Sequence, residues 1–477
     1  MTLGKKIEIF ILAVLLCCGF LARLYRFDGP VADWHSWRQA DTSAVSRNFV
    51  NNGINLLYPK FDDLSNVPSG IYDNPEGYRF VEFPLYNFFH AALYNLVGVF
   101  TLEEWGRLVS IFSSLCSAVF LYLIFSYRKQ NILGIVSAFF YLFIPYNIFY
   151  SRAILPDSMM IMAVTGATYF FQLWLGEKSK QVIYFVISLL FMISALLLKP
   201  YALFFVLPIV YLAYEKFGNS VFKNWRLWFY ALVSLLPLLF WRLWIQNFPA
   251  GIPASGWLLN GNGIRFRPSF FRWIFYERLT ALISGYFGVI ILISGILNLK
   301  QYKDRLFIAT FGVSSLLYVT VFATGNVQHD YYQILIMPTV SIFFALGAIF
   351  LYRYKYKSLE VGKAILVLSL ISLFVLGWNQ VKDYFNINNP SIIAAGAAVD
   401  RLTPKDAKII AIYNGDTTFL YQTKRKGWAS FEKSIPEMVK MGADYLVLAN
   451  PTPVDLGLGN TYQIIEKTSQ YVIFKLE

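Results

Sequence analysis

Residues 182–198 read VIYFVISLLFMISALLL, an apolar run that contains no charged side chain. A helix needs about 20 such residues to cross the hydrocarbon core of a bilayer. Comparable runs recur along the chain to about residue 379. Their unbroken apolar character is typical of membrane helices, and it excludes a transmembrane barrel, whose strands alternate apolar and polar residues.

The composition agrees with a membrane protein that crosses the bilayer many times. Of the 477 residues, 57% are hydrophobic and 14% are charged, whereas soluble domains carry about 25% charged residues. Lys and Arg exceed Asp and Glu by 41 to 28, a net charge of +13. Most of these cations lie in short loops between apolar runs, where retention of basic residues in the cytoplasm explains them. We therefore predict no nucleic-acid partner.

Eleven apolar segments have the length of a membrane span. They are residues 8–24, 107–127, 131–150, 157–175, 182–198, 201–215, 228–246, 276–298, 305–323, 333–352 and 362–379. The ambiguous segment is 84–101, which is apolar but short and contains Asn87, His90 and Asn95. We interpret it as a juxtamembrane or re-entrant helix.

The distribution of basic residues predicts the orientation. If 84–101 does not cross, alternate loops contain fourteen Lys or Arg, whereas the short opposite loops contain only Arg152 and Lys199. Basic loops stay in the cytoplasm. We therefore predict a multi-pass protein of the cell inner (plasma) membrane with its N-terminus in the cytoplasm.

This topology predicts two domains. Residues 1–380 form an all-α polytopic membrane domain, whose long first outer loop, 25–106, carries juxtamembrane helices. Residues 381–477 have ordinary charge density, and three β-like runs at 409–413, 445–448 and 471–474 lie between helix-like stretches at 391–402 and 431–441. We predict a small extracytoplasmic α/β domain.

Ionisable side chains gather in the predicted outer loops, and such groups near a membrane are candidates for function. Asp41 has two interpretations, an N-cap of a helix or a general base at the membrane surface. Glu82 lies between Phe80 and Phe83, where a carboxylate needs a compensating partner. That partner is either a substrate group or a structural arginine, Arg38 or Arg79.

Several other polar residues share this predicted face. Arg152 and Lys199 lie at outer ends of spans, where they either snorkel or bind a lipid phosphate. Asp157 either caps a span or contacts a ligand. No paired-His or CxxC spacing indicates a zinc site, and the three cysteines lie in apolar runs. A divalent cation held by carboxylates stays open.

The order of these motifs resembles the GT-C membrane glycosyltransferases related to protein O-mannosyltransferases and the lipid A aminoarabinose transferase. The resemblance rests on residues 35–42 (HSWRQADT), Tyr58-Pro59 with Asp62, residues 82–86 (EFPLY), 106–108 (GRL), Ser151-Arg152, Pro156-Asp157, and His329 with Tyr331-Tyr332 before Pro338. It extends over about residues 1–350. Many relatives have an Asp-Glu pair in the first loop, whereas this chain reads Arg38-Gln39 there, so the base is either Asp41 or Asp33.

The resemblance implies an inverting glycosyltransferase with a polyprenyl-phosphate-linked sugar as donor and a glycan, lipid or protein as acceptor. Asp41 and Glu82 would be the catalytic residues. The residues expected to bind the donor or acceptor are His35, Arg38, Asp62, Arg152, Asp157, Lys199, His329 and Tyr332. The alternative function is a transporter or flippase of a lipid-linked sugar or another anion. Transporters place charged residues near the bilayer midplane, whereas these lie on one face.

Overall fold

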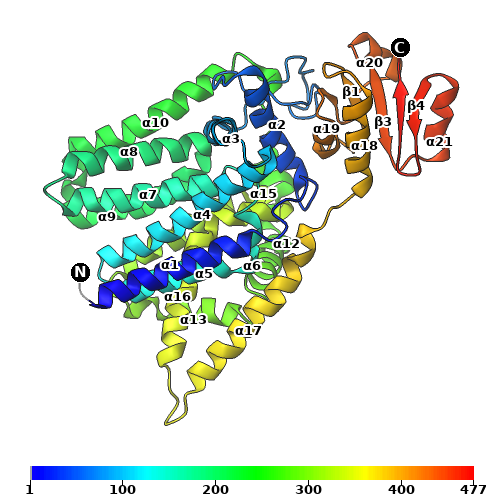
Figure 1. Ribbon diagram of the computed structural model, residues 1–477. Helices are drawn as coiled ribbons and strands as arrows, with labels where there is room; N and C mark the ends of the chain where they lie inside the picture. Colours follow the sequence, from blue (N-terminus) through cyan, green and yellow to red (C-terminus); the bar gives the residue numbers. More distant parts are fainter. Residues whose placement is uncertain (1–2) are drawn as a thin grey trace. The chain divides into compact units, whose positions relative to one another are not determined.

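The structure is a computed structural model that describes residues 3–477, and most of them are helical (Figure 1). Contacts divide the chain into two compact units. Unit 1 comprises Met1–Phe27, Arg107–Phe240 and Ser255–Asp383, and unit 2 comprises Asp28–Gly106, Trp241–Ala254 and Tyr384–Glu477. The first outer loop and the C-terminal tail, far apart in the sequence, therefore fold into one body.

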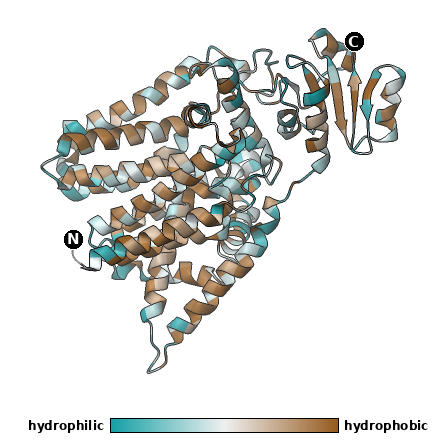
Figure 2. Ribbon diagram, in the orientation of Figure 1, coloured by the Kyte–Doolittle hydropathy of each residue, from teal (hydrophilic) through white to brown (hydrophobic). Residues whose placement is uncertain are grey.

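Long apolar helices make up most of the first 383 residues, and they are coloured brown along most of their length in Figure 2. Their bounds are α1 Leu3–Arg23, α4 Leu102–Tyr127, α5 Asn131–Phe143, α6 Pro145–Tyr150, α7 Asp157–Gly176, α8 Gln181–Leu198, α9 Leu207–Phe217, α10 Trp225–Ile245, α13 Val289–Asn298, α14 Arg305–Val321, α16 Met337–Arg353 and α17 Val361–Val381. The short helices among them are α11 Trp257–Asn260, α12 Pro268–Phe271 and α15 Ala323–Gln328.

Segments of 3₁₀-helix and one π-helix connect these α-helices. The 3₁₀ segments are η1 Pro200–Val206, η2 Gly218–Lys223, η3 Pro249–Gly251, η4 Gly261–Phe266, η6 Leu299–Gln301, η7 Asp330–Ile336 and η8 Lys382–Phe385, and η5 Arg272–Ile283 is a π-helix. Neighbouring spans such as α7 and α8 lie side by side (Figure 1).

Among the described residues, seven helical segments are long and apolar enough to cross a membrane. They are Leu102–Tyr127, Asp157–Gly176, Gln181–Leu198, Pro200–Lys223, Trp225–Ile245, Asp330–Arg353 and Val361–Leu402. Three shorter apolar helices cover Asn131–Phe143, Val289–Gln301 and Arg305–Val321. The all-helical membrane architecture is confirmed, whereas the count of eleven spans stays a prediction.

Two segments predicted as single spans are each broken into two helices. In 131–150, α5 ends before Ile144, and Pro145 begins α6 because proline lacks the N–H that would continue the helix. In 276–298, the break lies at Gly285, which has φ +53°. A Cβ there would lie 2.6 Å from the Ser372 carbonyl oxygen of α17, so only glycine allows this close approach.

The ambiguous segment 84–101 forms a short helix, α3 Leu85–Leu96. Its 12 residues rise about 18 Å at 1.5 Å each. This length is too short for a hydrocarbon core of about 30 Å. The helix length thus agrees with the interpretation that this segment does not cross.

Helices α13 and α16 pack closely through two glycines. A Cβ at Gly347 would lie 1.8 Å from the Ile291 carbonyl oxygen, and a Cβ at Gly295 would lie 2.0 Å from the Phe343 carbonyl oxygen. Small residues allow such backbone contact in membranes, where van der Waals packing rather than the hydrophobic effect holds helices together.

Unit 2 combines the outer loop with an α/β tail. The loop contains α2 Ser36–Asn52 and α3, and the tail contains α18 Pro390–Leu402, α19 Thr418–Thr423, α20 Ile435–Lys440, α21 Pro453–Leu456, the 3₁₀ segment η9 Gly457–Asn460, β1 Ile409–Ala411, β2 Gly427–Trp428, β3 Tyr445–Ala449, β4 Gln463–Lys467 and β5 Tyr471–Lys475. The strand order is β2-β1-β3-β5-β4. Strand β1 pairs in parallel with β2 and β3, and β5 pairs antiparallel with β3 and β4. The predicted α/β tail is confirmed.

The outer loop extends the edge of this sheet. Asp63 forms a parallel bridge to Gly427 of β2, the Leu64 N–H donates to the Gly427 carbonyl at 2.8 Å, and the Gly427 N–H donates to the Asp62 carbonyl at 2.9 Å. Edge strands need such cover. The loop thus satisfies the backbone groups that β2 would otherwise expose.

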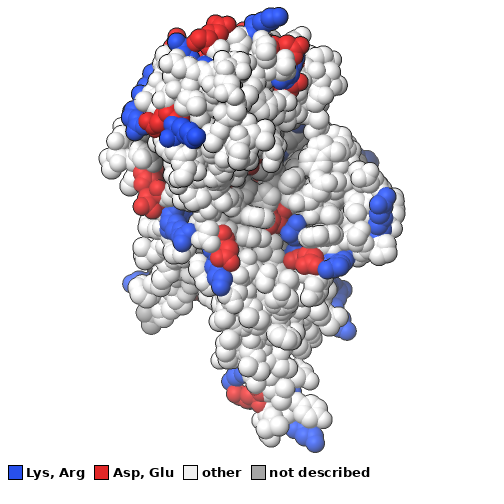
Figure 3. Space-filling model, turned by 90° about the vertical axis from the view of Figure 1, so that its right-hand side faces the viewer, with Lys and Arg blue, Asp and Glu red and all other residues white. Residues whose placement is uncertain are grey.

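On the face drawn in Figure 3, Lys, Arg, Asp and Glu form small separate groups with wide uncharged areas between them. Many large apolar side chains of the spans are exposed, for example Leu190, Phe240 and Leu368. Exposed apolar patches of this extent fit contact with lipid rather than water.

The α13–α16 contact predicts a specific sensitivity. Gly347→Ala places a methyl group against the Ile291 backbone and is expected to lower stability by about 1–3 kcal/mol, the usual cost of overpacking. The measurement is the thermal unfolding midpoint of the purified chain in detergent. Gly4→Ala is the matched control because a Cβ there meets nothing within 4 Å. Equal midpoints for the two variants would contradict the packing argument.

Candidate active site

The Asp41 carboxylate is buried and held at both oxygens. Its residue is 3% exposed. Oδ2 accepts a hydrogen bond from Arg79 Nη2 at 2.5 Å, and Oδ1 accepts one from Thr417 Oγ1 at 2.7 Å. Arg79 belongs to the outer loop and Thr417 to the tail. Two distant segments therefore fix one carboxylate.

The interpretation of Asp41 as an N-cap is wrong. Helix α2 begins at Ser36, and the residue before it, His35, adopts a left-handed conformation with φ 53°. Asp41 lies more than one turn inside the helix, where its side chain is directed to tertiary partners. Asp157 is not an N-cap either. It is the first residue of α7, and Pro156 before it occupies the N-cap position.

Glu82 pairs with Arg38. Arg38 Nη2 lies 2.6 Å from Oε1 and 2.8 Å from Oε2 of Glu82, and both side chains are less than 10% exposed. Asp41 and Glu82 line the same small cavity, together with Arg38, Arg79 and Asn87. Its volume of about 10 Å³ leaves room for roughly one water molecule.

A second ion pair links α2 to the tail. Arg47 pairs with Asp62, donates to the Tyr421 carbonyl at 3.0 Å and lies 4.1 Å over the Tyr421 ring. The Tyr421 hydroxyl donates to Glu103 at 2.5 Å. Asp62 also accepts from Asn48. These contacts give Asp62, predicted to bind substrate, a structural set of partners.

The tail brings one acid that the sequence did not indicate. Asp416 precedes Thr417 and accepts a hydrogen bond from the Thr418 N–H at 2.7 Å. Burial raises the pKa of Asp416, the nearby Asp41 carboxylate acts in the same direction, and His35 opposes it. No spacing in the sequence relates residue 416 to residue 41, since the proximity arises only from tertiary folding.

Asp33, the alternative base, is also fixed. It is 5% exposed, and its Oδ1 accepts a hydrogen bond from Gln39 Nε2 at 2.7 Å. The neighbouring ring of Trp34 lies 5.1 Å from the ring of His35 and stacks on Tyr384 at 5.0 Å. Both candidate bases therefore belong to unit 2.

A separate polar cluster lies in unit 1 around Lys199. Lys199 Nζ lies 2.9 Å from Asp157 Oδ1, and both side chains are buried. The ammonium lies 5.7, 5.8 and 5.9 Å from the ring centroids of Tyr201, Tyr331 and Tyr332. Within the described residues, Asp157 Oδ2 is buried and has no hydrogen-bond partner. The three tyrosine rings stabilise the Lys199 ammonium, which is shielded from water.

His329 belongs to this cluster, whereas the contacts of Arg152 lie elsewhere in the chain. The His329 ring lies 5.7 and 6.1 Å from Tyr331 and Tyr332. Arg152 is 2% exposed, and its Nη1 donates to the Arg26 carbonyl at 3.1 Å. Arg265, another arginine of unit 1, donates to the carbonyls of Leu259, Thr320 and Val321, which gives it a structural role.

Asp330, which is not among the residues expected to bind a ligand, is buried beside His329. Its carboxylate accepts a hydrogen bond from the Tyr150 hydroxyl at 2.5 Å, and its carbonyl accepts one from Tyr146 at 2.7 Å. Arg278 lies 4.0 Å from its second oxygen. Its position beside His329 was the available signal.

The predicted site residues thus fall into two groups. His35, Arg38, Asp41, Asp62 and Glu82 belong to unit 2, and Arg152, Asp157, Lys199, His329 and Tyr332 belong to unit 1. Among residues 3–477, no three His, Cys, Asp or Glu side chains converge as metal ligands would.

One further buried acid joins the loop to the sheet. Asp63 is 1% exposed and accepts hydrogen bonds from the Ser65 N–H at 3.1 Å and the Ser65 hydroxyl at 2.8 Å. Burial raises the pKa of Asp63 to about 7, and Asp41 and Glu432 act in the same direction. Asp63 therefore titrates near neutral pH.

Comparisons with known proteins agree on one fold. Residues 75–244 match the family model described as dolichyl-phosphate-mannose-protein mannosyltransferase. A search of curated proteins gives no match. Among solved structures, apo ArnT from Cupriavidus metallidurans matches with a TM-score of 0.66 at 12% identity over 100% of this chain and 99% of that one. ArnT bound to undecaprenyl phosphate gives 0.65 at 11% identity, with the same coverage.

Two further structures extend this likeness. Oligosaccharyltransferase AglB from Archaeoglobus fulgidus, in complex with an inhibitory peptide and a dolichol-phosphate, matches with a TM-score of 0.59 at 10% identity over 94% of this chain and 70% of that one. Arabinofuranosyltransferase AftD from Mycobacteria gives 0.59 at 12% identity over 98% and 40%. The resemblance to GT-C membrane glycosyltransferases is confirmed.

The Asp63 environment predicts a pH dependence of stability. Because folding raises the pKa from 3.8 to about 7, the folded state holds this proton where the unfolded state has lost it. The contribution of Asp63 to the stability of the folded state is therefore favourable at low pH. It declines as the pH rises from about 4 to 7 and is constant above pH 7. Asp63→Asn should remove this decline from unfolding midpoints measured across that range. Asp406→Asn, at an exposed residue, is the control. Identical pH profiles for Asp63→Asn and the parent chain would contradict the assignment.

Proposed function

Since this chain is a membrane protein of the GT-C fold, we propose that it is an inverting glycosyltransferase that uses a polyprenyl-phosphate-linked sugar. The observation that carries the proposal is the match over nearly the whole of both chains to a structure bound to undecaprenyl phosphate. The AglB complex with a dolichol-phosphate supports the same donor class. The reaction would take place on the extracytoplasmic side, where the positive-inside rule puts the outer loop.

Asp41 is the proposed general base. The acceptor oxygen or nitrogen attacks the anomeric carbon from the side opposite the phosphate, and its proton passes to Asp41. The bond from the anomeric carbon to the phosphate oxygen breaks, so lipid phosphate leaves with the bonding electrons and the configuration inverts. Arg79 pairs with the Asp41 carboxylate, and Thr417 fixes its orientation.

A carboxylate suffices as the base when glycosyl transfer passes through an oxocarbenium-like transition state, because the nucleophile becomes acidic only as its new bond forms. Glu82, paired with Arg38 beside Asp41, would position the sugar. Asp33 remains the alternative base.

Lys199 and Arg152 are the proposed partners of the donor phosphate. Lys199 is buried beside Asp157 and three tyrosine rings. Because water is excluded there, the attraction between its ammonium and an anion is stronger than at an exposed lysine. His329 and Tyr332 would contact the sugar or the lipid phosphate from the same cluster. The sugar is a hexose or a pentose, and a panel of donors assigns it.

The first test replaces the base. Asp41→Asn should reduce release of polyprenyl phosphate from a polyprenyl-phosphate sugar by about 10²–10⁴-fold, the usual contribution of general base catalysis. Asp406→Asn should retain the parent rate. Thermal unfolding checks that the variant folds, since it leaves Arg79 without a buried anion.

Asp33→Asn distinguishes the two candidate bases. A rate of Asp33→Asn near that of the parent chain supports Asp41 as the base. A full loss in Asp33→Asn, with turnover retained in Asp41→Asn, would contradict the assignment.

The second test addresses Thr417. Thr417→Val removes the hydroxyl that orients Asp41 and should lower kcat several-fold, the effect of losing one hydrogen bond worth about 1 kcal/mol. The KM for the donor should stay unchanged, and Thr417→Ser should restore the rate. A loss in Thr417→Val that Thr417→Ser does not restore would assign a packing role to this residue instead.

A further inference from the structure

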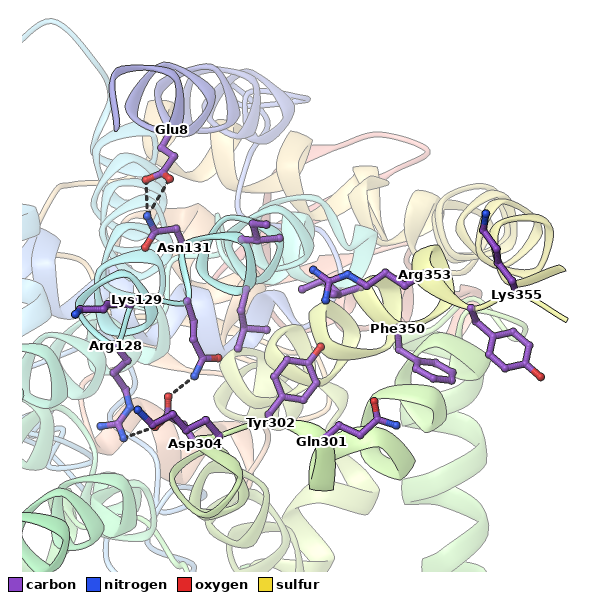
Figure 4. A pocket seen from close by; sticks show the side chains of 16 residues that line it. Glu8, Arg128, Lys129, Asn131, Gln301, Tyr302, Asp304, Phe350, Arg353 and Lys355 are labelled. Carbon is purple, nitrogen blue, oxygen red and sulfur yellow. Dashed lines mark hydrogen bonds and ion pairs between the residues drawn. The ribbon is translucent and has the colours of Figure 1, made fainter. Parts of the chain in front are cut away.

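Unit 1 contains a cavity that the proposed reaction does not use. Its volume is about 980 Å³. It lies where α4 passes into α5, where α16 ends and where η6 leads to α14, with Glu8 of α1 on its wall (Figure 4). In unit 1, Lys199 follows the end of α8 and Asp157 begins α7, whereas the cavity lies at the other ends of the membrane helices.

Three basic loops meet at this cavity. Residues 127–130, 300–305 and 352–363 are separate in the sequence and were each predicted to face the cytoplasm. The cations that line the cavity are Arg128, Lys129, Lys303, Arg353 and Lys355, and the carboxylates are Glu8 and Asp304. The cavity therefore has an excess of positive charge.

Both carboxylates are already engaged. Glu8 accepts hydrogen bonds from Asn131 Nδ2 at 2.8 and 2.9 Å, and Asp304 pairs with Arg128 at 2.6 Å. Arg128 also pairs with Glu215. Asp304 and Glu215 neutralise Arg128, and Lys355 pairs with Glu360, whereas Lys129, Lys303 and Arg353 have no ion pair among the described residues.

Arg353 is the most favourably placed of the uncompensated cations. Within residues 3–477, the side chains of Lys129, Lys303 and Arg353 form no hydrogen bond or ion pair with other residues. In Figure 4 the guanidinium of Arg353 extends into the cavity, and the Tyr302 hydroxyl points toward it. A guanidinium beside a hydroxyl donor suits phosphate oxygens, which accept several hydrogen bonds at once.

The cavity is also partly apolar. Ile132, Leu133, Ile349 and Phe350 contribute to its lining. A free phosphate ion gains nothing from such a surface, whereas a phospholipid places its phosphate among the cations and the first carbons of its chains against the apolar residues. Basic pockets between membrane helices are suited to anionic headgroups.

We propose that this cavity binds the headgroup phosphate of an anionic phospholipid. The site is distinct from the donor site and does not depend on the proposed glycosyl transfer. Arg353 and Lys303 hold the phosphate, and the Tyr302 hydroxyl donates to it.

Binding of phosphatidylglycerol to the purified full-length chain in detergent tests the proposal, with phosphatidylcholine as the zwitterionic comparison. Native mass spectrometry reports the affinity for each lipid. The parent chain should prefer phosphatidylglycerol. The double variant Arg353→Gln, Lys303→Gln should weaken that affinity by roughly fivefold for each charge removed, the size expected for a basic residue at an anionic surface.

The matched control is Arg226→Gln, since Arg226 is an exposed arginine near the start of α10 that does not line the cavity. It should keep the parent affinity. An unchanged affinity in the double variant, or equal loss in the control, would overturn the site. Displacement of the lipid by millimolar inorganic phosphate would overturn the lipid as ligand and identify a free-anion site.

Discussion

Burial of the Asp41 carboxylate is the constraint on which unit 2 of this protein depends. Removing a charge from water costs several kcal/mol unless a partner compensates it. Arg79 supplies the opposite charge and Thr417 a hydrogen bond, so the loop and the tail must both fold for Asp41 to be accommodated. Arg47 and Asp62 add a second link between α2 and the tail, through Tyr421.

Chemistry on one side of a membrane fits this arrangement better than transport. In our proposal Asp41 takes the proton of the acceptor, and the Lys199 cluster is suited to an anion. The basic cavity lies at the opposite helix ends of unit 1 and serves, in our proposal, to hold a structural lipid. The two proposals therefore assign two anion sites with different chemistry to one chain.

The sequence predicted those helices and strands that local residue patterns determine. Apolar runs predicted the membrane helices, and β-branched runs predicted β1, β3 and β5. It could not predict β2, which has only two residues and is defined by its parallel pairing with β1. Breaks at Pro145 and Gly285 depend on local chemistry and on the approach of α17. Asp41, Glu82 and Lys199 were chosen from their surroundings in the chain, whereas Thr417 and Asp416 became apparent only from tertiary contacts.

The most direct measurement follows a polyprenyl-phosphate sugar incubated with purified protein and a set of acceptors in detergent, without a sealed membrane. The account predicts that polyprenyl phosphate forms in equal amount with glycosylated acceptor, whose anomeric configuration is opposite to that of the donor. If detergent-solubilised protein leaves the donor intact, while the same protein in sealed vesicles moves it between leaflets, the chain is a transporter and the account is contradicted.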